Sequence, residues 1–302
     1  MSINAHGRKN ARIAVALGVS VVLSACAEQR RIVAFGDVHG DLDATRSALR
    51  LAGAIDAEDR WIGGRLVVVQ TGDQLDRGGD EQAILDLFEQ LRVQAAAAGG
   101  AFHALLGNHE MMNVRGDLRY VTDEGFADFA DAVDRGPNDP LLTEFEPHER
   151  GRMAALLPGR PYARLLAERA VVLRVGKNVF VHGGVLPDHV TYGIDRINRE
   201  AQDWLRAKTD RPDILVGPDS PQWTRQYSQE PDSVACDTLA EVLSRLEARR
   251  MVMGHTVQDG GITSACEGLA WRIDVGMAAH YGGAVEVLEI IGDSVRVLRV
   301  GR

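Results

Sequence analysis

Cysteine is scarce in this chain: its 302 residues include only Cys26, Cys236 and Cys266. None of the three lies in a motif, so the sequence does not indicate a thiolate metal site. If the chain is exported, Cys236 and Cys266 enter an oxidising compartment, where they could pair. The sequence does not show whether their Cα atoms lie close enough, and two unpaired, partly buried thiols fit it equally well.

Positive charge is also in short supply, with 34 Lys and Arg against 43 Asp and Glu and a net charge of −9. An acidic protein repels polyanions at long range, so nucleic acid is not an expected partner. A small phosphorylated group would still fit a local basic or metal-lined pocket. Hydrophobic residues make up 45% and charged residues 25%, which is an ordinary globular composition for one large domain without internal repeats.

The sequence lacks an apolar run long enough to span a bilayer, which takes about 20 residues. Residues Ile13–Ala25 form a shorter apolar run behind the positive charges of Arg8, Lys9 and Arg12, as in a signal peptide. Its ending, Leu-Ser-Ala-Cys, resembles a bacterial lipobox, in which the cysteine receives a lipid. A plain signal peptide and an uncleaved N-terminal anchor are the alternatives.

We therefore predict a lipoprotein signal peptide over residues 1–25 and lipidation of Cys26. The protein would be anchored in the bacterial cell envelope, on the periplasmic side. Ala27 stands where an aspartate would retain a lipoprotein in the inner membrane, which favours the outer membrane. The remaining residues, 26–302, are expected to form a single domain.

The domain begins with alternating strand and helix patterns. Apolar, β-branched runs predict strands at Arg31–Phe35, Arg65–Gln70 and Ala101–Leu106, with helices over Asp41–Leu51 and Asp80–Ala98 between them. This order is typical of a parallel sheet whose functional loops follow the strands.

The rest of the chain gives a less regular pattern. Asp117–Glu168 has no strand signals and is predicted to be a helical insertion. A hairpin is expected over Ala170–Val175 and Asn178–Val181, and helices over Ile194–Ala207 and Ser233–Arg249. Four further strands are expected in a second, mostly antiparallel sheet: Met251–Met253, Leu269–Val275, Ala284–Ile290 and Ser294–Val300.

Five short segments place Asp, Asn or His beside glycine, each after a predicted strand. They are Gly36-Asp37-Val38-His39-Gly40-Asp41, Gly72-Asp73-Gln74-Leu75-Asp76-Arg77-Gly78, Gly107-Asn108-His109-Glu110, His182-Gly183-Gly184 and Gly254-His255-Thr256. Any one of them alone is most often a turn. All five together indicate a shared site, because glycine lets the backbone turn sharply toward a ligand.

These segments contain a complete set of metal ligands. The candidates are Asp37, His39, Asp73, Asn108, His182 and His255. Asp37 and His39 are spaced to reach one ion, and the two oxygens of Asp73 can bridge two. Mixed carboxylate, amide and imidazole ligation suits Mn, Fe or Zn better than Ca. The sequence therefore predicts two divalent cations.

The same motifs resemble those of the calcineurin-like metallophosphoesterases. The versions with Asp41 and with Asp76-Arg77 look like the phosphoprotein phosphatase branch. Met112–Val114, Asp117–Val121 and Trp223–Arg225 are similar to segments of the bacterial Shewanella-like phosphatases. The resemblance covers roughly residues 31 to 290. It implies a four-layer α/β/β/α sandwich of two mixed sheets flanked by helices.

The resemblance also implies how the ligands are divided. Asp37, His39 and Asp73 would hold the first metal; Asp73, Asn108, His182 and His255 would hold the second. Many members of the wider superfamily carry a second histidine where this chain has Val257. The valine fits the phosphoprotein phosphatase branch and argues against the nuclease and cyclic phosphodiesterase branches.

Catalytic roles follow from the chemistry of phosphate ester hydrolysis. A hydroxide bridging the metals would attack phosphorus. His109 is the candidate acid for the leaving oxygen, and Asp76 could hold its other ring N–H. Arg77 and Arg225, together with the ligand Asn108, are candidates to bind the substrate phosphate. Alternatively, Arg77 pairs with a neighbouring carboxylate and Arg225 is an ordinary loop arginine.

The expected activity is hydrolysis of a phosphomonoester, with phosphorylated Ser, Thr or Tyr in a protein as the favoured substrate. A dinucleoside polyphosphate or another small phosphoester is the alternative within the same chemistry. Alternatives of another class are a catalytically silent envelope scaffold and an anchored structural protein that uses metal for stability alone. Metal identity, target and oligomeric state are not fixed by the sequence.

Overall fold

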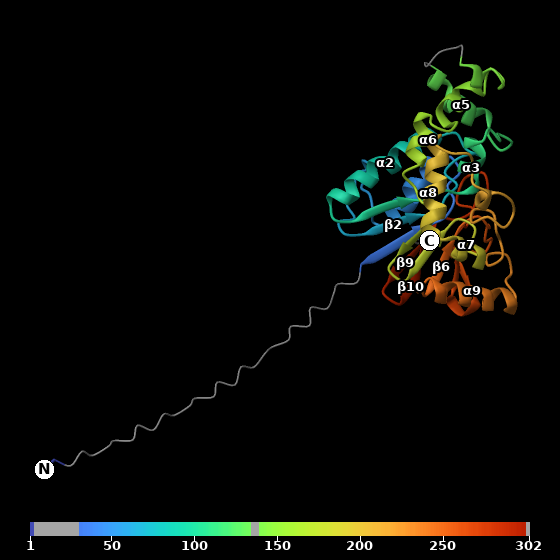
Figure 1. Cartoon of the computed structure of the whole chain (residues 1–302). Coiled ribbons are helices and arrows are strands. Elements are labelled where there is room, and N and C mark those ends of the chain that lie inside the picture. The colour runs from blue at the N-terminus through green and yellow to red at the C-terminus, as the bar shows by residue number, and fades with distance from the viewer. Residues whose placement is uncertain (3–29, 134–138, 300–302) are drawn as a thin grey trace.

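The computed structural model describes residues 1–2, 30–133 and 139–299. Two five-stranded sheets face each other, with helices on their outer sides, which confirms the predicted four-layer α/β/β/α sandwich (Figure 1). Apart from residues 1–2, the predicted signal peptide lies outside the described residues, and so does Cys26. None of the described helices combines the length and apolar character needed to cross a bilayer.

The first sheet has the strand order β10-β9-β1-β2-β3. Its strands are β1 (Arg31–Phe35), β2 (Val67–Gln70), β3 (Ala101–Ala104), β9 (Glu286–Ile291) and β10 (Ser294–Arg299). β1, β2 and β3 run parallel, whereas β9 pairs antiparallel with both β1 and β10. Helices α1 (Leu42–Leu51) and α2 (Glu81–Ala97) connect the parallel strands, as expected from the alternating pattern.

The second sheet has the order β4-β5-β6-β8-β7. Its strands are β4 (Val172–Val175), β5 (Asn178–Val181), β6 (Arg250–Met253), β7 (Thr263–Ala265) and β8 (Ala270–Arg272). β5, β6 and β8 are parallel, and the two edge strands are antiparallel to their neighbours. The predicted hairpin is confirmed as β4 and β5.

The prediction that the last four strands share one antiparallel sheet was wrong. β6 and β8 belong to the second sheet, but β9 and β10 return to the first and cover the free edge of β1. The strand expected over Leu269–Val275 ends at Arg272, and β7 was missed because Thr263–Ala265 is too short and too polar to give a strand signal. Pairing partners depend on tertiary contacts, which no local pattern encodes.

Alternate residues of the second sheet face opposite layers. Phe180 and Val252 pack toward the first sheet, whereas Val181 and Met253 pack toward the outer helices. This period-two pattern makes both faces of the second sheet apolar, so it can be held between the first sheet and a helical layer. The sandwich keeps the strand ends in fixed positions.

Residues 117–168 contain helices and no strand within their described part, as predicted. The helices between β3 and β4 are α3 (Asn108–Val114), α4 (Asp123–Asp128), η1 (Ala130–Val133), η2 (Pro140–Leu142), α5 (Arg150–Leu156) and α6 (Pro161–Leu166). Those after β5 are α7 (Pro187–Tyr192), α8 (Ile194–Leu205), η3 (Asp213–Leu215), α9 (Ser233–Arg245) and η4 (Cys266–Gly268). Figure 1 shows α5 at one end of the molecule and α9 at the other.

Cys236 and Cys266, whose pairing the sequence left open, form a disulfide between α9 and η4. The bond closes a loop of 30 residues that contains β6 and the His255 turn. Loop-closure entropy for such a loop gives a stabilisation of about 3–4 kcal/mol.

Cys236→Ser is therefore expected to lower the free energy of unfolding by about 3 kcal/mol, measured by urea denaturation under oxidising conditions. The double variant Cys236→Ser/Cys266→Ser serves as control and should lose no more than the single variant. Reduction of the wild-type protein should reproduce the loss. An unchanged unfolding curve in reductant would contradict a stabilising disulfide.

Candidate metal centre

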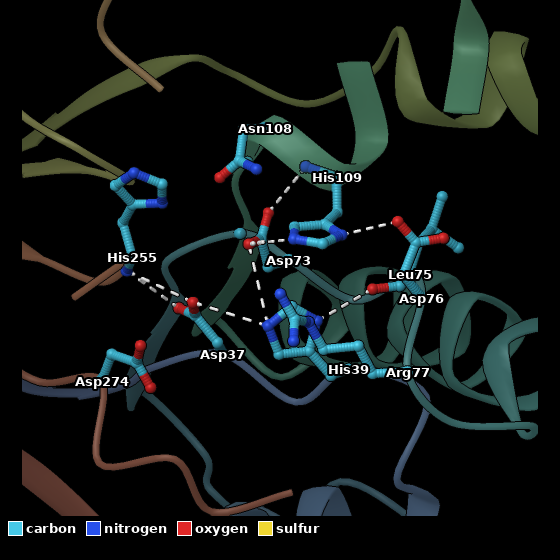
Figure 2. A network of polar contacts seen from close by, with 12 residues as sticks. Asp37, His39, Asp73, Leu75, Asp76, Arg77, Asn108, His109, His255 and Asp274 are labelled. Carbon is cyan, nitrogen blue, oxygen red and sulfur yellow. Dashed lines mark hydrogen bonds and ion pairs between the residues drawn. The ribbon is translucent and has the colours of Figure 1, made fainter. Parts of the chain in front are cut away.

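The predicted ligands all lie just beyond the carboxyl ends of parallel strands. Asp37 and Asp73 follow β1 and β2, and Asn108 follows β3 in the first sheet. His182 follows β5 and His255 follows β6 in the second. Both sheets contribute their parallel strand ends to the same place, and Figure 2 shows Asp37, Asp73, Asn108 and His255 around it. His182 joins them, with Nε2 2.9 Å from Asn108 Oδ1.

Several residues of the centre adopt left-handed backbone conformations. The φ angles are 40° at His39, 59° at Asp73, 69° at Asp76 and Arg77, and 67° at His255. Such angles are uncommon outside glycine, and they reverse the chain tightly enough for neighbouring side chains to enter the centre together.

Three histidines are oriented by backbone carbonyls. His39 Nδ1 donates to Leu75 O at 3.0 Å, His182 Nδ1 to Thr71 O at 2.9 Å, and His255 Nε2 to Trp223 O at 3.1 Å. A carbonyl can only accept, so the bonded nitrogen of each ring carries the proton. In a neutral ring the other nitrogen presents a lone pair, the form in which histidine binds a metal.

Two of these lone pairs face oxygen atoms that are also acceptors. His182 Nε2 lies 2.9 Å from Asn108 Oδ1 and 3.1 Å from Asp73 Oδ2. His39 Nε2 lies 3.8 Å from Asp73 Oδ2 and 3.9 Å from Asp37 Oδ2. Acceptors that converge without donors between them fit a cation.

In the described part of the chain, the two central carboxylates have histidines but no lysine or arginine bonded to them. Asp37 and Asp73 are each 2% exposed. Burial, with Asp274 and Asp73 nearby, raises the pKa of Asp37. Burial lowers the pKa of His39 to about 4, which keeps its ring neutral. Although burial disfavours its charged form, the neighbouring histidines lower the pKa of Asp73. A buried Asp37 beside a neutral His39 fits a divalent cation.

Asp73 lies at the centre of the arrangement. It belongs to both groups of ligand atoms that lie within 4.8 Å of one another, one with His39 and His109 and one with His182 and His255. Asp73 is therefore the residue that the two groups share.

His109 differs from the three other histidines because its partner is a carboxylate. Its Nδ1 lies 2.5 Å from Asp76 Oδ2, and its backbone N–H donates to Asp73 Oδ1 at 2.9 Å. Burial would lower the pKa of His109, but Asp73 and Asp76 outweigh it and raise the pKa. The ring can thus carry a proton, as a general acid requires.

Glu110 fixes the loop that carries Asp73. Its carboxylate accepts backbone N–H groups from Gly107 at 2.7 Å, Gln74 at 2.8 Å, Asp73 at 2.9 Å and Leu75 at 3.2 Å. Glu110 therefore positions the loop of Asp73 through four backbone N–H groups.

Arg77 lies at the rim of the centre. Its Cζ is 4.8 Å from the Tyr120 ring centroid and 5.2 Å from that of Tyr281, and its Nη1 donates to His280 Nε2 at 3.1 Å. Within the described residues it forms no ion pair with a carboxylate, so the alternative considered from the sequence is not observed. Arg225 instead donates from Nη1 to His255 O at 2.7 Å and to Thr256 Oγ1 at 2.9 Å.

Asp274, Tyr120 and Tyr281 are parts of the centre that sequence reasoning missed. Asp274 is 2% exposed and lies beside Asp37 (Figure 2). Burial raises its pKa to about 6. It follows β8 as Asp37 follows β1, but the strand predicted over Leu269–Val275 included it and hid that signal.

Residues 30–259 match the profile of the calcineurin-like phosphoesterases. The chain belongs to this family. It is therefore a phosphoesterase, a hydrolase, and family membership implies divalent metal ions. Within the family it is similar to Shewanella-like protein phosphatase 2 of Arabidopsis thaliana, with 42% identity over 89% of this chain and 77% of the relative.

Solved structures agree on the calcineurin-like phosphoesterase fold. A cold-active protein-tyrosine phosphatase of a psychrophilic Shewanella species has a TM-score of 0.70 and 24% identity, covering 90% of this chain and 81% of that one. A protein serine/threonine phosphatase from Saccharomyces cerevisiae has a TM-score of 0.55 and 14% identity, over 91% and 82%. At these identities the likeness shows the fold alone.

Proposed function

We propose that this phosphoesterase is a dinuclear, metal-dependent phosphomonoesterase that acts on phosphorylated proteins. The observation that carries the proposal is the orientation of His39, His182 and His255: each ring contacts a backbone carbonyl through one nitrogen, which leaves the other nitrogen for ligation. His39 would ligate the first ion with Asp37. Asn108, His182 and His255 would ligate the second, with Asp73 shared. Similarity to named protein phosphatases supports the substrate class.

Two bound cations would supply positive charge that activates water and neutralises the phosphoryl oxygens. The chain's own residues would do the rest. Arg77, held between Tyr120 and Tyr281, presents its guanidinium to the substrate phosphate. His109 gives the proton on Nε2 to the leaving oxygen, while Asp76 holds Nδ1 and the orientation of the ring.

The proposal is tested by elemental analysis and a substrate panel. We expect two equivalents of Mn, Fe or Zn per chain, and turnover of phosphopeptides that chelation removes and metal restores. Diadenosine tetraphosphate is the small-molecule substrate for comparison. If the protein hydrolyses it in preference to phosphopeptides, the assignment as a protein phosphatase is wrong. Tight metal binding without turnover of any ester would support the silent scaffold instead.

We also propose that the mature protein starts at Cys26 and is held in the envelope by lipid, with residues 26–302 forming one domain. The support is the Leu-Ser-Ala-Cys ending of the apolar run. Cys26→Ser should abolish incorporation of a labelled fatty acid and move the protein from the membrane to the soluble fraction. Cys236→Ser is the control and should stay in the membrane fraction. A Cys26→Ser protein that still fractionates with membranes would refute the lipid anchor.

A further inference from the structure

Arg152, on helix α5 of the insertion, is an arginine with no exposure to solvent. Arginine is almost never fully buried unless its charge is paired. Its guanidinium binds both carboxylate oxygens of Glu81 at the start of α2, and its Nε donates to Asn113 Oδ1 at 2.7 Å. Its Nη2 also donates to Asp76 Oδ1 at 3.2 Å.

The last contact connects Arg152 to the proposed proton donor. Asp76 Oδ2 faces His109 Nδ1, whereas Asp76 Oδ1 accepts from Arg152 and, at 2.8 Å, from Asn113 Nδ2. Asn113 Nδ2 also donates to His109 O at 2.9 Å. Arg152 and Asn113 together leave only one oxygen of Asp76 to face the imidazole.

The same cluster supports the backbone of Asp76. Its φ of 69° is a left-handed angle, which is uncommon for residues other than glycine. Asp76 N donates to Glu81 Oε1, and Glu81 is in turn held by Arg152. Thus both the main chain and the carboxylate of Asp76 depend on a charge that α5 supplies.

We infer that Arg152 is a positioning residue for the His109–Asp76 pair, and that helix α5 belongs to the catalytic apparatus rather than only covering the site. This inference rests on the proposed function. A fixed Asp76 keeps the imidazole in the orientation that proton transfer requires, and small errors in such geometry are costly. A purely structural role is the competing explanation, because Arg152 Nη1 also donates to Gly125 O at 3.0 Å inside the insertion.

Arg152→Lys separates the two explanations, since lysine keeps the charge but cannot reach Glu81, Asn113 and Asp76 together. We expect turnover of an alkyl phosphate, whose leaving group needs a proton, to fall by about 10–100-fold. Turnover of p-nitrophenyl phosphate should fall much less, and the metal content should stay the same. In a protein that already carries His109→Ala, Arg152→Lys should cause no further loss of alkyl phosphate turnover.

Arg250→Lys is the matched control. Arg250 is 4% exposed on β6 and donates to Asp293 O, remote from the cluster. Arg250→Lys should lower the free energy of unfolding and leave the ratio of alkyl phosphate turnover to p-nitrophenyl phosphate turnover unchanged. If Arg152→Lys does not fold, Asn113→Ala replaces it, because it removes the second donor to Asp76 without leaving a charge unpaired, and the same pattern is expected.

Equal losses for both esters, or losses that add to those of His109→Ala, would overturn the positioning role and leave the phosphomonoesterase proposal standing. A wild-type protein that binds two metals and hydrolyses no phosphomonoester would overturn both.

Discussion

Replacing Asp73 with asparagine is expected to abolish hydrolysis and metal binding together. Asp73 Oδ2 lies 3.1 Å from His182 Nε2 and 3.8 Å from His39 Nε2, so one carboxylate serves both halves of the centre. Asparagine has nearly the same shape but lacks the negative charge and one oxygen. The substitution therefore tests ligation with little change in packing, and kcat should fall by about 10³-fold or more.

The measurement pairs elemental analysis with hydrolysis of p-nitrophenyl phosphate on the purified variant. Asp43→Asn is the matched control, because Asp43 is an exposed residue of α1 and should keep both metals and full activity. A variant that retains two metals and wild-type turnover would show that Asp73 is not the shared ligand. Loss of one metal with partial turnover would restrict its role to a single ion.

Replacing His109 with alanine has the second largest expected effect, and it should act on chemistry without removing metal. The Nε2 atom of the ring lies 3.7 Å from Asp73 Oδ2, and Asp76, which contacts Nδ1, stabilises the protonated form of the ring. Loss of a general acid lowers the rate by about 10²–10⁴-fold, most for esters with basic leaving groups. We expect a large fall in kcat for alkyl phosphates, a small fall for p-nitrophenyl phosphate, and two metals still bound.

His103→Ala provides the comparison, since His103 is a partly buried histidine on β3 and lies outside the centre. It should leave the ratio of the two rates unchanged. If His109→Ala slowed both esters equally, or lost metal, His109 would be a ligand or a structural residue. Its position in one of the two ligand groups makes this comparison necessary.

Much of the first sheet could be predicted because its sequence is locally consistent. β1 and β2 are apolar, β-branched runs that end in Gly-Asp, and an amphipathic helix follows each. The chain's return to this sheet through β9 could not be predicted in the same way. The pairing of Val33 with Glu289 depends on contacts between residues that are distant in the sequence.

The residues of the candidate centre were easier to predict than the pairing of the last strands, for a chemical reason. Each ligand is marked twice, by its own residue type and by the glycine or strand end next to it, as at Asp37 and His255. Arg152 and Asp274 carry no such mark. Arg152 lies in a short helix without a motif, and Asp274 lies within an expected strand. Only the folded chain shows that Arg152 contacts Asp76 and that Asp274 lies near Asp37.

Stability of the native state and turnover make opposite demands on five residues with left-handed backbone angles: His39, Asp73, Asp76, Arg77 and His255. Each such angle costs the native state about 1 kcal/mol or more, which glycine would recover at the expense of the side chain. Glycine at any of the five positions would relax the backbone but remove a side chain of the centre, and at Asp76 it would also take a buried partner from His109 and Arg152. Five of the eleven non-glycine residues with positive φ in the described part of the chain thus lie in this one centre.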